Sequence, residues 1–262
     1  MKKIFALILT AVLSLTLLAG CGASGKTLAD IKEAGKLIVA TSPDFPPFEN
    51  LEDGEVVGIE VDIMNKVCEK LGVELVLEQM DFDSVLLGIQ AGKYDVGMSG
   101  ITVNADREKN MLFTDPYCLA AQAIVVKADS AIASKADLAG KSVAVQTGTT
   151  AESFCMDNGY DVKSFAANSD AQSALTTGKV DAWVIDDLTA AAMVAEYNAD
   201  NADQLVILPE AMTTEPYAFA FSFGSEDLVA EINKILADLI ADGTVEQAFT
   251  KFEAPYTPAS AK

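Results

Sequence analysis

The sequence predicts an α/β protein built from two related lobes. Two pairs of segments support this, because each pair repeats one pattern in both halves of the chain. "VLLGIQAGKYDVGMS" (residues 85–99) aligns with "AQSALTTGKVDAWVI" (171–185), and "GKLIVATS" (35–42) aligns with "GKSVAVQT" (140–147). The first pair is typical of a helix that ends at glycine and leads into a short apolar strand. Convergence also produces such short matches, but their recurrence in the same order favours two lobes.

The first half of the chain alternates predicted strands and helices. The order is strand 36–41, helix 59–71, strand 74–78, helix 83–91 and strand 94–98. The strands are short apolar runs, and helical stretches separate them. Connections of this length join parallel strands, so we expect parallel-type sheets with crossover helices.

The second half repeats this alternation. The order is strand 142–146, helix 150–158, strand 161–165, helix 169–177, strand 180–185 and helix 188–197. After these, "YAFAFSFG" (217–224) predicts one more strand. An amphipathic helical stripe follows, formed by Leu228, Ile232, Ile235, Leu236 and Leu239. We therefore expect the C-terminal part of the chain to complete the first lobe.

The N-terminal segment predicts export. It has two lysines, an apolar run from Ile4 to Leu18 and small residues up to Cys21, which is the layout of a secretory signal peptide. The run is too short for a comfortable transmembrane helix. "LAGC" is similar to the lipobox of bacterial lipoproteins. We expect removal of residues 1–20, lipidation of Cys21 and a flexible tether within residues 21–30. The alternative is an ordinary signal peptide with a chance cysteine.

Charge and composition exclude several functions. The leader contains two of the 18 basic residues, so 16 basic and 39 acidic residues remain without it, a net charge of −23. Such a surface repels nucleic acid. The chain has no histidine, which removes histidine triads, histidine metal ligands and the commonest general base. We expect no metal, no cofactor and no catalytic residue.

Three cysteines follow Cys21, at positions 68, 118 and 155, without the close spacing of a metal site. Free thiols are one reading of this pattern. A disulfide between Cys118 and Cys155 is the other, because an exported protein meets oxidising conditions.

Ligands of parallel α/β sheets bind beyond the carboxyl ends of the strands, so the loops there are the candidate site. One of these loops contains Arg107, the only arginine of the chain. A guanidinium pairs with a carboxylate in a planar geometry that lysine cannot copy. Ser99, Gly100 and Thr102 precede it and offer hydroxyls and an approachable backbone. Alternatively, Arg107 belongs to a solvated polar run with its charged neighbours.

A second loop, "TGTTAE", places Thr149 and Glu152 at the spacing of a capping box. The free N–H groups of a helix start then lie beside Thr150, where they attract anions. A helix cap without any ligand is the simpler interpretation.

A third loop contains Asp186 and Asp187 between a buried strand and a helix. Either aspartate could cap that helix, or it could bind an ammonium group. If Arg107 and Thr150 hold a carboxylate while Asp186 holds an ammonium group, the ligand is an α-amino acid.

Aromatic residues lie close to these loops. "DFPPFE" contains Phe45 and Phe48 around two prolines that stiffen the segment, and Phe82 follows in "MDFDS". We expect core packing for Phe48. Phe45 and Phe82 lie in polar turns, so we expect them to contact the ligand.

Six motifs in order are similar to a known family. They are "VATSPDFPPFE", "VGIEVDIMNKVCEKLG", "MDFDSVLLGIQAGKYDVGMSGITVNADRE", "VAVQTGTTAE", "GKVDAWVIDD" and "ADGTVEQAFTKF". Together they resemble the polar amino acid-binding proteins of bacterial ABC importers, the extracellular solute-binding family 3, from residue 28 to about residue 253.

The resemblance implies a two-lobed, periplasmic-binding-protein-like fold of type II, with the ligand in a cleft between the lobes. A two-strand hinge is expected near residues 117–122 and 213–217. Lobe 1 then comprises residues 31–117 plus 217–255, and lobe 2 comprises residues 118–216.

The resemblance also implies roles for individual residues. Arg107 matches the arginine that grips the α-carboxylate, and Asp186 matches the aspartate that takes the α-ammonium group. Phe45 and Phe82 match the aromatic pair that sandwiches the ligand side chain. The expected ligand-binding residues are Ser42, Phe45, Phe82, Ser99, Gly100, Thr102, Arg107, Gln146, Thr149, Thr150 and Asp186.

Departures from the family pattern bear on the ligand. Relatives that bind glutamine or basic amino acids often have an aspartate where this chain has Ser42. The glutamine binder has lysine and histidine where this chain has Gln146 and Ile185. No charged group is evident for a charged side chain unless Asp44 turns inward. Burying an unpaired charge is costly, so we predict a neutral ligand, polar or moderately apolar.

Taken together, the resemblance implies a monomeric substrate-binding lipoprotein that delivers a free amino acid to an ABC permease, with an ATPase driving release. Its place is the outer face of the cell membrane or the periplasm. Two alternatives stay open. A sensor subunit for a signalling receptor has the same site. A cyclohexadienyl-dehydratase-like enzyme shares the fold, although the missing histidine and the lack of an evident raised-pKa pair argue against it.

Overall fold

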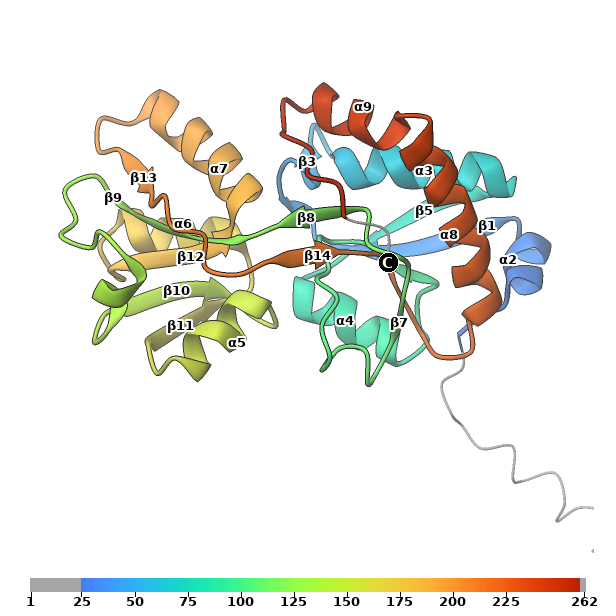
Figure 1. The fold of residues 1–262 in the computed structure, drawn as a ribbon, viewed down its shortest axis with the longest axis horizontal. Coiled ribbons are helices and arrows are strands. Elements are labelled where there is room, and N and C mark those ends of the chain that lie inside the picture. The colour runs from blue at the N-terminus through green and yellow to red at the C-terminus, as the bar shows by residue number, and fades with distance from the viewer. Residues whose placement is uncertain (1–24, 260–262) are drawn as a thin grey trace, which may run out of the picture.

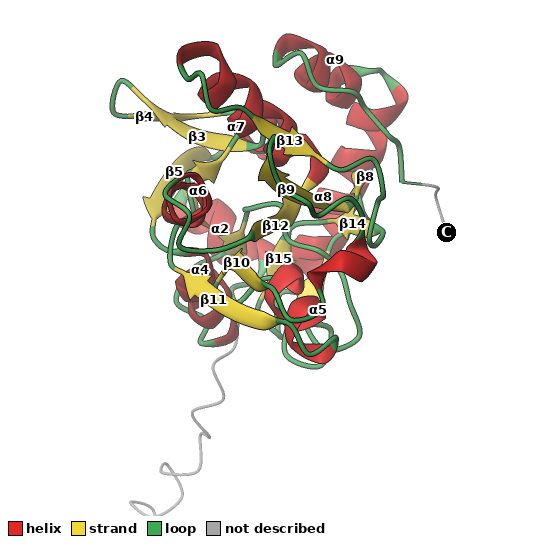
Figure 2. Cartoon of the chain, turned by 90° about the vertical axis from the view of Figure 1, so that its left-hand side faces the viewer, coloured by secondary structure: helices red, strands yellow, loops and turns green. Residues whose placement is uncertain are grey.

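A computed structural model describes residues 25–259, which form two lobes side by side, each built on a five-stranded sheet (Figure 1). Helices lie on both faces of each sheet. Figure 2 shows the molecule from the end at which the second sheet faces the viewer. The signal peptide and the lipidated Cys21 predicted above lie outside the described residues.

The first sheet has the strand order β5-β1-β6-β15-β7. Its strands are β1 (Lys36–Thr41), β5 (Glu74–Gln79), β6 (Val96–Gly97), β7 (Leu112–Phe113) and β15 (Ala220–Phe221). Its helices are α2 (Leu28–Ala34), α3 (Ile59–Leu71), α4 (Phe82–Gln90), α8 (Glu226–Ala241) and α9 (Thr244–Lys251). The predicted stripe of α8 is buried at all five positions, so the C-terminal helices complete this lobe as expected.

The second sheet has the order β11-β10-β12-β9-β13. Its strands are β9 (Gln122–Lys127), β10 (Ser142–Gln146), β11 (Asp161–Phe165), β12 (Ala182–Asp186) and β13 (Leu205–Ile207). The helical elements around it are the 3-10 helix η1 (Lys135–Leu138), α5 (Thr150–Asp157), α6 (Asn168–Thr176) and α7 (Asp187–Asp200).

Each sheet contains the predicted parallel pairs with crossover helices and, in addition, antiparallel strands. The strand pairs linked by crossover helices, β1 with β5 and β10 with β11, are parallel as predicted. By contrast, β9 runs antiparallel to β12, and β15 runs antiparallel to β6. The direction of β9 depends on the edge at which the chain enters the second sheet. Gln122, the first residue of β9, pairs with Asp186, the last residue of β12, because the chain arrives from the other lobe at the cleft edge.

Two strands connect the lobes, as the resemblance implied. They are β8 (Cys118–Ala120) and β14 (Glu215–Tyr217), which pair antiparallel and run between the sheets (Figure 1). The prediction of one strand over residues 217–224 is therefore wrong. Tyr217 ends the connecting strand β14, whereas Ala220 pairs with Gly97 in the first sheet. The lobe boundaries at residues 117–118 and 216–217 stay a prediction.

A small three-stranded sheet was not predicted. It consists of β2 (Asp44–Phe45), β3 (Glu49–Glu52) and β4 (Glu55–Val57). Asp53 and Gly54 join β3 to β4, both with positive φ (51° and 88°), which is the backbone of a two-residue hairpin turn. The Asp-Gly pair was a usable signal for this hairpin.

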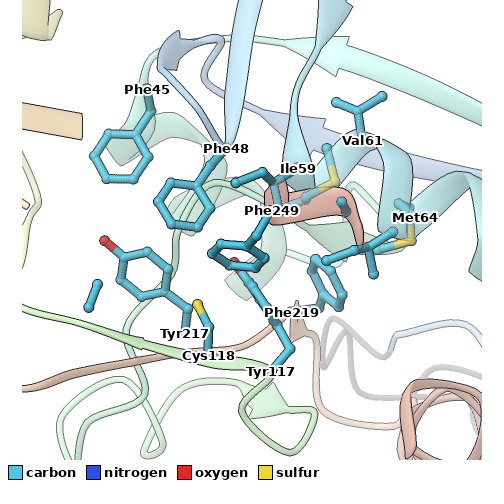
Figure 3. Packing of buried hydrophobic residues seen from close by; sticks show 14 of the residues in the cluster. Phe45, Phe48, Ile59, Val61, Met64, Tyr117, Cys118, Tyr217, Phe219 and Phe249 are labelled. Carbon is cyan, nitrogen blue, oxygen red and sulfur yellow. The ribbon is translucent and has the colours of Figure 1, made fainter. Parts of the chain in front are cut away.

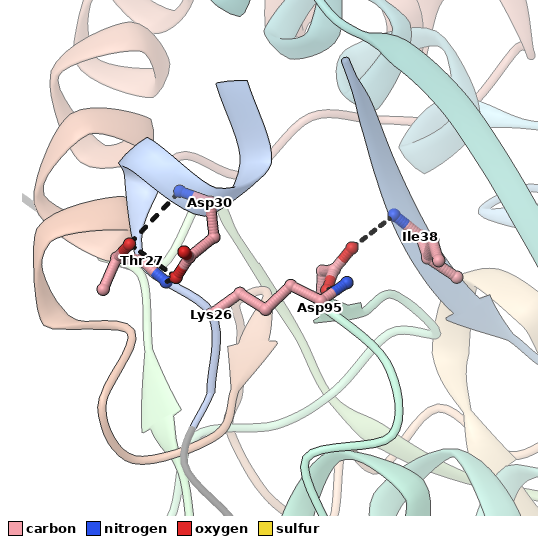
Figure 4. Close-up of polar contacts among 5 residues, drawn as sticks. All are labelled: Lys26, Thr27, Asp30, Ile38 and Asp95. Carbon is pink, nitrogen blue, oxygen red and sulfur yellow. Dashed lines mark hydrogen bonds and ion pairs between the residues drawn. The ribbon is translucent and has the colours of Figure 1, made fainter. Parts of the chain in front are cut away.

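The repeated Gly-Lys-x-Asp segments have the same structural role in both lobes. Asp95 Oδ2 accepts the N–H of Ile38 in β1 at 2.8 Å, and Asp181 Oδ2 accepts the N–H of Ser142 in β10 at 2.8 Å. In the first lobe Lys26 also pairs with Asp95 at 2.9 Å (Figure 4). The repeated sequence therefore corresponds to a shared interaction, in which the aspartate side chain accepts a backbone N–H of the neighbouring strand.

Aromatic side chains join the β2–β4 sheet to the core of the first lobe (Figure 3). Phe48 is fully buried and packs edge-on against Tyr217 and Phe249, with ring centroids 5.1 and 5.9 Å apart, which confirms the expected core packing. Cys68, Cys118 and Cys155 are buried free thiols, so the structure contains no Cys118–Cys155 bridge. Between residues 25 and 259, no helix is both long and apolar enough to cross a membrane.

Candidate functional site

A small cavity of about 20 Å³, the space open to the centre of a water molecule, lies between the carboxyl-end loops of the two sheets. Its walls are formed by Ser42, Phe45, Phe82, Ser99, Gly100, Thr102, Arg107, Gln146, Thr149, Thr150 and Asp186. These are the eleven residues expected to bind the ligand. The structure brings them together, and their role in binding stays a prediction.

Arg107 faces this cavity instead of belonging to a solvated run. Its Nη1 donates to the carbonyl of Thr102 at 2.9 Å, and its Nη2 donates to the carbonyl of Gly148 in the other lobe at 3.2 Å. The guanidinium carbon lies 5.5 Å from the centroid of the Phe82 ring. Burial lowers the pKa of Arg107, while the nearby carboxylates of Glu215 and Asp186 act to raise it. The arginine stays cationic, because a guanidinium does not lose its proton in proteins.

The start of α5 forms part of the opposite wall. The Thr149 side chain caps this helix and accepts the N–H of Glu152 at 3.2 Å. The reciprocal bond of a capping box is absent here, because the Glu152 carboxylate accepts the N–H of Gly148, at 2.7 Å. The capping-box prediction is therefore only half correct. The first N–H groups of a helix have no intrahelical acceptor, so Thr150 brings a local positive potential to the cavity.

Asp186 ends β12 and is 7% exposed. Its side chain does not cap α7. Instead, its two carboxylate oxygens accept hydrogen bonds from Gln122 Nε2, at 2.5 Å, and from the hydroxyl of Tyr217. Burial and the charge of Glu215 raise the pKa of Asp186 to about 7, although these two hydrogen bonds act to lower it.

Three polar residues behind this wall were missed by the sequence reasoning. They are Gln122, Glu215 and Tyr217, and all are buried. Thr150 Oγ1 donates to Glu215 Oε2 at 3.0 Å, and Gln122 Nε2 lies 3.2 Å from the same hydroxyl. These residues therefore hold Asp186 and Thr150 in place. The signal that could have found them is their position, because all three lie within the predicted crossing segments 117–122 and 213–217, which pass between the lobes.

Phe45 and Phe82 line the cavity, as the polar turns around them suggested. Phe45 packs closely against Gly100, whose φ is 54°. A Cβ atom at position 100 would lie 2.5 Å from the Phe45 ring. Glycine is thus required here both for the left-handed backbone and for the close approach of the ring.

Asp44 does not turn into the cavity. Its carboxylate crosses to the second lobe and accepts the N–H groups of Asn168 and Ser169, the latter at 3.2 Å, at the start of α6. Asn168 Nδ2 in turn donates to the carbonyl of Asp44 and to Gln146 Oε1, both at 3.1 Å. Arg107 and Asp186 are therefore the two charged residues that line the cavity.

Glu49 and Glu60 are fully buried behind the Ser99–Gly100 segment, and burial raises the pKa of both carboxyls. This corrects the expectation that the site region has no pair with raised pKa values. Neither residue lines the cavity, so the pair does not face a ligand. Within residues 25–259 no group of acidic residues and cysteines has the arrangement of a metal site.

Residues 37–254 match the family described as "Bacterial extracellular solute-binding proteins, family 3". The "L-cystine-binding protein TcyJ" of Escherichia coli (strain K12) is 31% identical over 255 residues, which cover 93% of this chain and 94% of that protein. The "Arginine-binding extracellular protein ArtP" of Bacillus subtilis (strain 168) is 33% identical over 258 residues, which cover 96% and 98% of the two chains.

Solved structures of similar proteins share this architecture. A mutant of ArgBP from T. maritima is 38% identical, with a TM-score of 0.81, over 86% of this chain and 98% of that one. An ancestral arginine-binding protein bound to glutamine is also 38% identical, with a TM-score of 0.79, over 84% and 99% of the two chains. The two-lobed fold predicted from the sequence is thereby confirmed.

Proposed function

Since the chain belongs to the bacterial extracellular solute-binding proteins of family 3, we propose that it captures one free, neutral α-amino acid for an ABC importer. The two relatives described above are named as binding proteins for amino acids, L-cystine and arginine. The identity of the amino acid and its delivery to a permease belong to the proposal.

The observation that carries the proposal is the pairing of Arg107 and Asp186 in one cavity. Arg107 is a two-pronged donor suited to an α-carboxylate, and the N–H groups at the start of α5 support the same charge. Asp186 is an acceptor suited to an α-ammonium group. A zwitterion satisfies both charges at once, whereas a simple anion or cation leaves one of them buried and unpaired.

We infer that the side chain of the ligand is neutral, because the cavity wall has no charged residue besides Arg107 and Asp186. The other lining residues are serines, threonines, glutamine, glycine and two phenylalanines. Asp44, which could have paired with a cationic side chain, is committed to α6. Relatives are named for arginine and cystine, but an ancestral arginine-binding scaffold also holds glutamine. A neutral polar ligand suits Ser42 and Gln146 at the side-chain end.

The proposed mechanism is capture by closure of the lobes, with residues 31–117 plus 217–255 as lobe 1 and 118–216 as lobe 2. The ligand first meets Arg107, Thr102 and the two phenylalanines on lobe 1. Asp186 and Thr150 then contact it from lobe 2. These later contacts exist only in the closed form, so the ligand shifts the equilibrium toward closure.

The proposal includes a lipid anchor at Cys21, because the "LAGC" segment precedes a tether of small residues. The monomer would then work at the outer face of a membrane that also holds its permease. Expression of Cys21→Ser should release the protein from the membrane fraction into the soluble extracytoplasmic fraction. Equal membrane association of both forms would argue against the anchor.

A thermal-shift screen of residues 22–262 tests the binding function. The ligands are the twenty amino acids with cystine and ornithine. A ligand present at one hundred times its dissociation constant stabilises the folded state by about 2.7 kcal/mol, which raises the melting temperature visibly. We expect a rise with one or a few neutral amino acids.

Arg107→Ala should abolish that rise. Lys109→Ala is the matched control, because it removes an exposed cation of the same loop that pairs with the exposed Asp106. A rise with arginine or lysine alone would refute the neutral ligand and keep amino-acid capture. A flat response to all compounds would refute both.

A further inference from the structure

Two carboxyl groups lie side by side in the interior of the first lobe, directly behind the cavity wall. Glu49 comes from β3 and Glu60 from the first turn of α3, and both side chains have no exposed surface. The two carboxyl groups are close enough that, after burial, the charge of Glu60 is the next cause that raises the pKa of Glu49. Within residues 25–259, no lysine or arginine forms an ion pair with either of them.

The surrounding groups distinguish the two carboxyls. Glu60 accepts the N–H of Gly100 on Oε2 at 3.0 Å and the hydroxyl of Tyr117 on Oε1 at 2.7 Å. Both of its oxygens therefore face donors, which suits an ionised carboxylate. Glu49 accepts the hydroxyl of Ser99 on Oε1 at 2.7 Å, whereas its buried Oε2 has no hydrogen-bond partner in the described part of the chain.

We infer that Glu49 and Glu60 share a single proton, carried on Glu49 Oε2 and donated to Glu60, and that this pair positions the Ser99–Gly100 wall of the cavity. Two carboxylates cannot hydrogen-bond without a proton between them. Two buried, adjacent negative charges without a cation are also strongly unfavourable. One proton removes both problems and satisfies the otherwise unpartnered Oε2 of Glu49.

The pair holds three lining residues in one chain of hydrogen bonds. The N–H of Ser42 donates to Ser99 Oγ at 3.1 Å, and the Ser99 hydroxyl donates to Glu49. The N–H of Gly100 donates to Glu60. Protonated Glu49 thus holds Ser99, and ionised Glu60 holds Gly100. Tyr117, which lies just before the connecting strand β8, donates to the same Glu60 carboxylate.

The asymmetry between the two acids gives a sharp test with two matched variants. In Glu49→Gln the amide oxygen still accepts from Ser99 and the amide N–H still donates to Glu60, so the variant copies the protonated acid. In Glu60→Gln a single amide oxygen replaces the two carboxylate oxygens that accept from Gly100 N–H and the Tyr117 hydroxyl, and the negative charge that faces the proton of Glu49 is lost. The same chemical change is therefore harmless at one position and disruptive at the other.

Infrared spectroscopy of the ligand-free protein detects the proton directly. The carbonyl stretch of a protonated carboxyl group is separate from that of a carboxylate. At about pH 8 most of Asp186 is ionised, because its pKa is about 7. We expect a protonated-carboxyl band in the wild type at this pH and its loss in Glu49→Gln. A wild-type spectrum without the band, or a band that survives in Glu49→Gln, would overturn the inference.

Hydrogen exchange of the Gly100 amide tests the positioning. Glu49→Gln should leave its exchange rate within about threefold of the wild type, and Glu60→Gln should accelerate it at least about tenfold. Equal acceleration in both variants would contradict the assigned roles. If Glu60→Gln does not fold, the infrared comparison of the wild type with Glu49→Gln decides alone.

The link from this pair to a ligand wall rests on the proposed function, but neither measurement requires a ligand. A failure to find any bound amino acid would therefore refute the proposed function. The infrared and hydrogen-exchange measurements would still test the shared proton.

Discussion

At the residue scale, the cavity contains one permanent cation and one carboxyl group whose charge depends on pH. Burial raises the pKa of Asp186 from 3.8 to about 7. The folded protein therefore holds this proton more tightly than the unfolded chain does. The resulting contribution to stability is complete below the unfolded pKa and is lost as the pH rises through the folded value.

The raised pKa of Asp186 predicts that the ligand-free protein loses stability as the pH rises. Between about pH 4 and pH 7 the free energy of unfolding of the wild type should fall relative to that of Asp186→Asn, by roughly 1.4 kcal/mol per pH unit at most. Urea denaturation of both proteins at several pH values measures the difference. Parallel pH profiles for the two proteins would show that Asp186 does not titrate in this range.

At the scale of elements, a helix of one lobe is capped by a residue of the other. The N-cap residue of α6 is Ala167, whose side chain makes no capping hydrogen bond. The carboxylate of Asp44 takes that place across the cleft. Opening of the lobes removes this cap from α6, so the contact stabilises only the closed form.

Asp44→Ala should therefore shift the protein toward the open form. Loss of a cap costs about 0.5–2 kcal/mol, which lowers the ratio of closed to open molecules by roughly 2- to 30-fold. Distances between spin labels at the exposed positions 52 and 200 measure this ratio. Asp170→Asn is the control, because it removes an exposed charge from the first turn of the same helix and, since this charge repels Asp44, should not favour the open form. An equal shift in both variants would assign the effect to charge alone.

At the scale of the whole molecule, the strands β8 and β14 connect the lobes, and the proposed closure would turn about them. Gln122 and Glu215 belong to the connecting region. They bond directly to the wall residues Asp186 and Thr150. Ligand contact and lobe position are thereby linked through a few hydrogen bonds.

We expect the radius of gyration to decrease when the amino acid identified by the thermal screen is added at saturating concentration. Small-angle X-ray scattering measures this change. Arg107→Ala should show no decrease, and Lys109→Ala should behave as the wild type. A wild-type radius that stays constant with a ligand bound would refute capture by closure.

The sequence by itself determined much of the fold and of the cavity wall. Helix 59–71 has its predicted bounds, and the other helices predicted in the two halves begin and end within three residues of prediction. These features depend on local periodicity and on end signals such as Gly72 and Thr149. The lining residues could be predicted because the loops after strands of one sheet meet at one edge, and because the family resemblance pointed to individual residues in those loops.

Only the tertiary structure decided how distant segments meet. Asp44 binds a helix that starts 124 residues later, and Glu60 meets Gly100 and Tyr117 at separations of 40 and 57 residues. The reversed direction of β9 has the same origin, because it depends on where the chain re-enters a sheet. Local patterns record periodicity over a few turns. They contain no information about which buried donor will face which acceptor once two lobes and their connecting strands have packed.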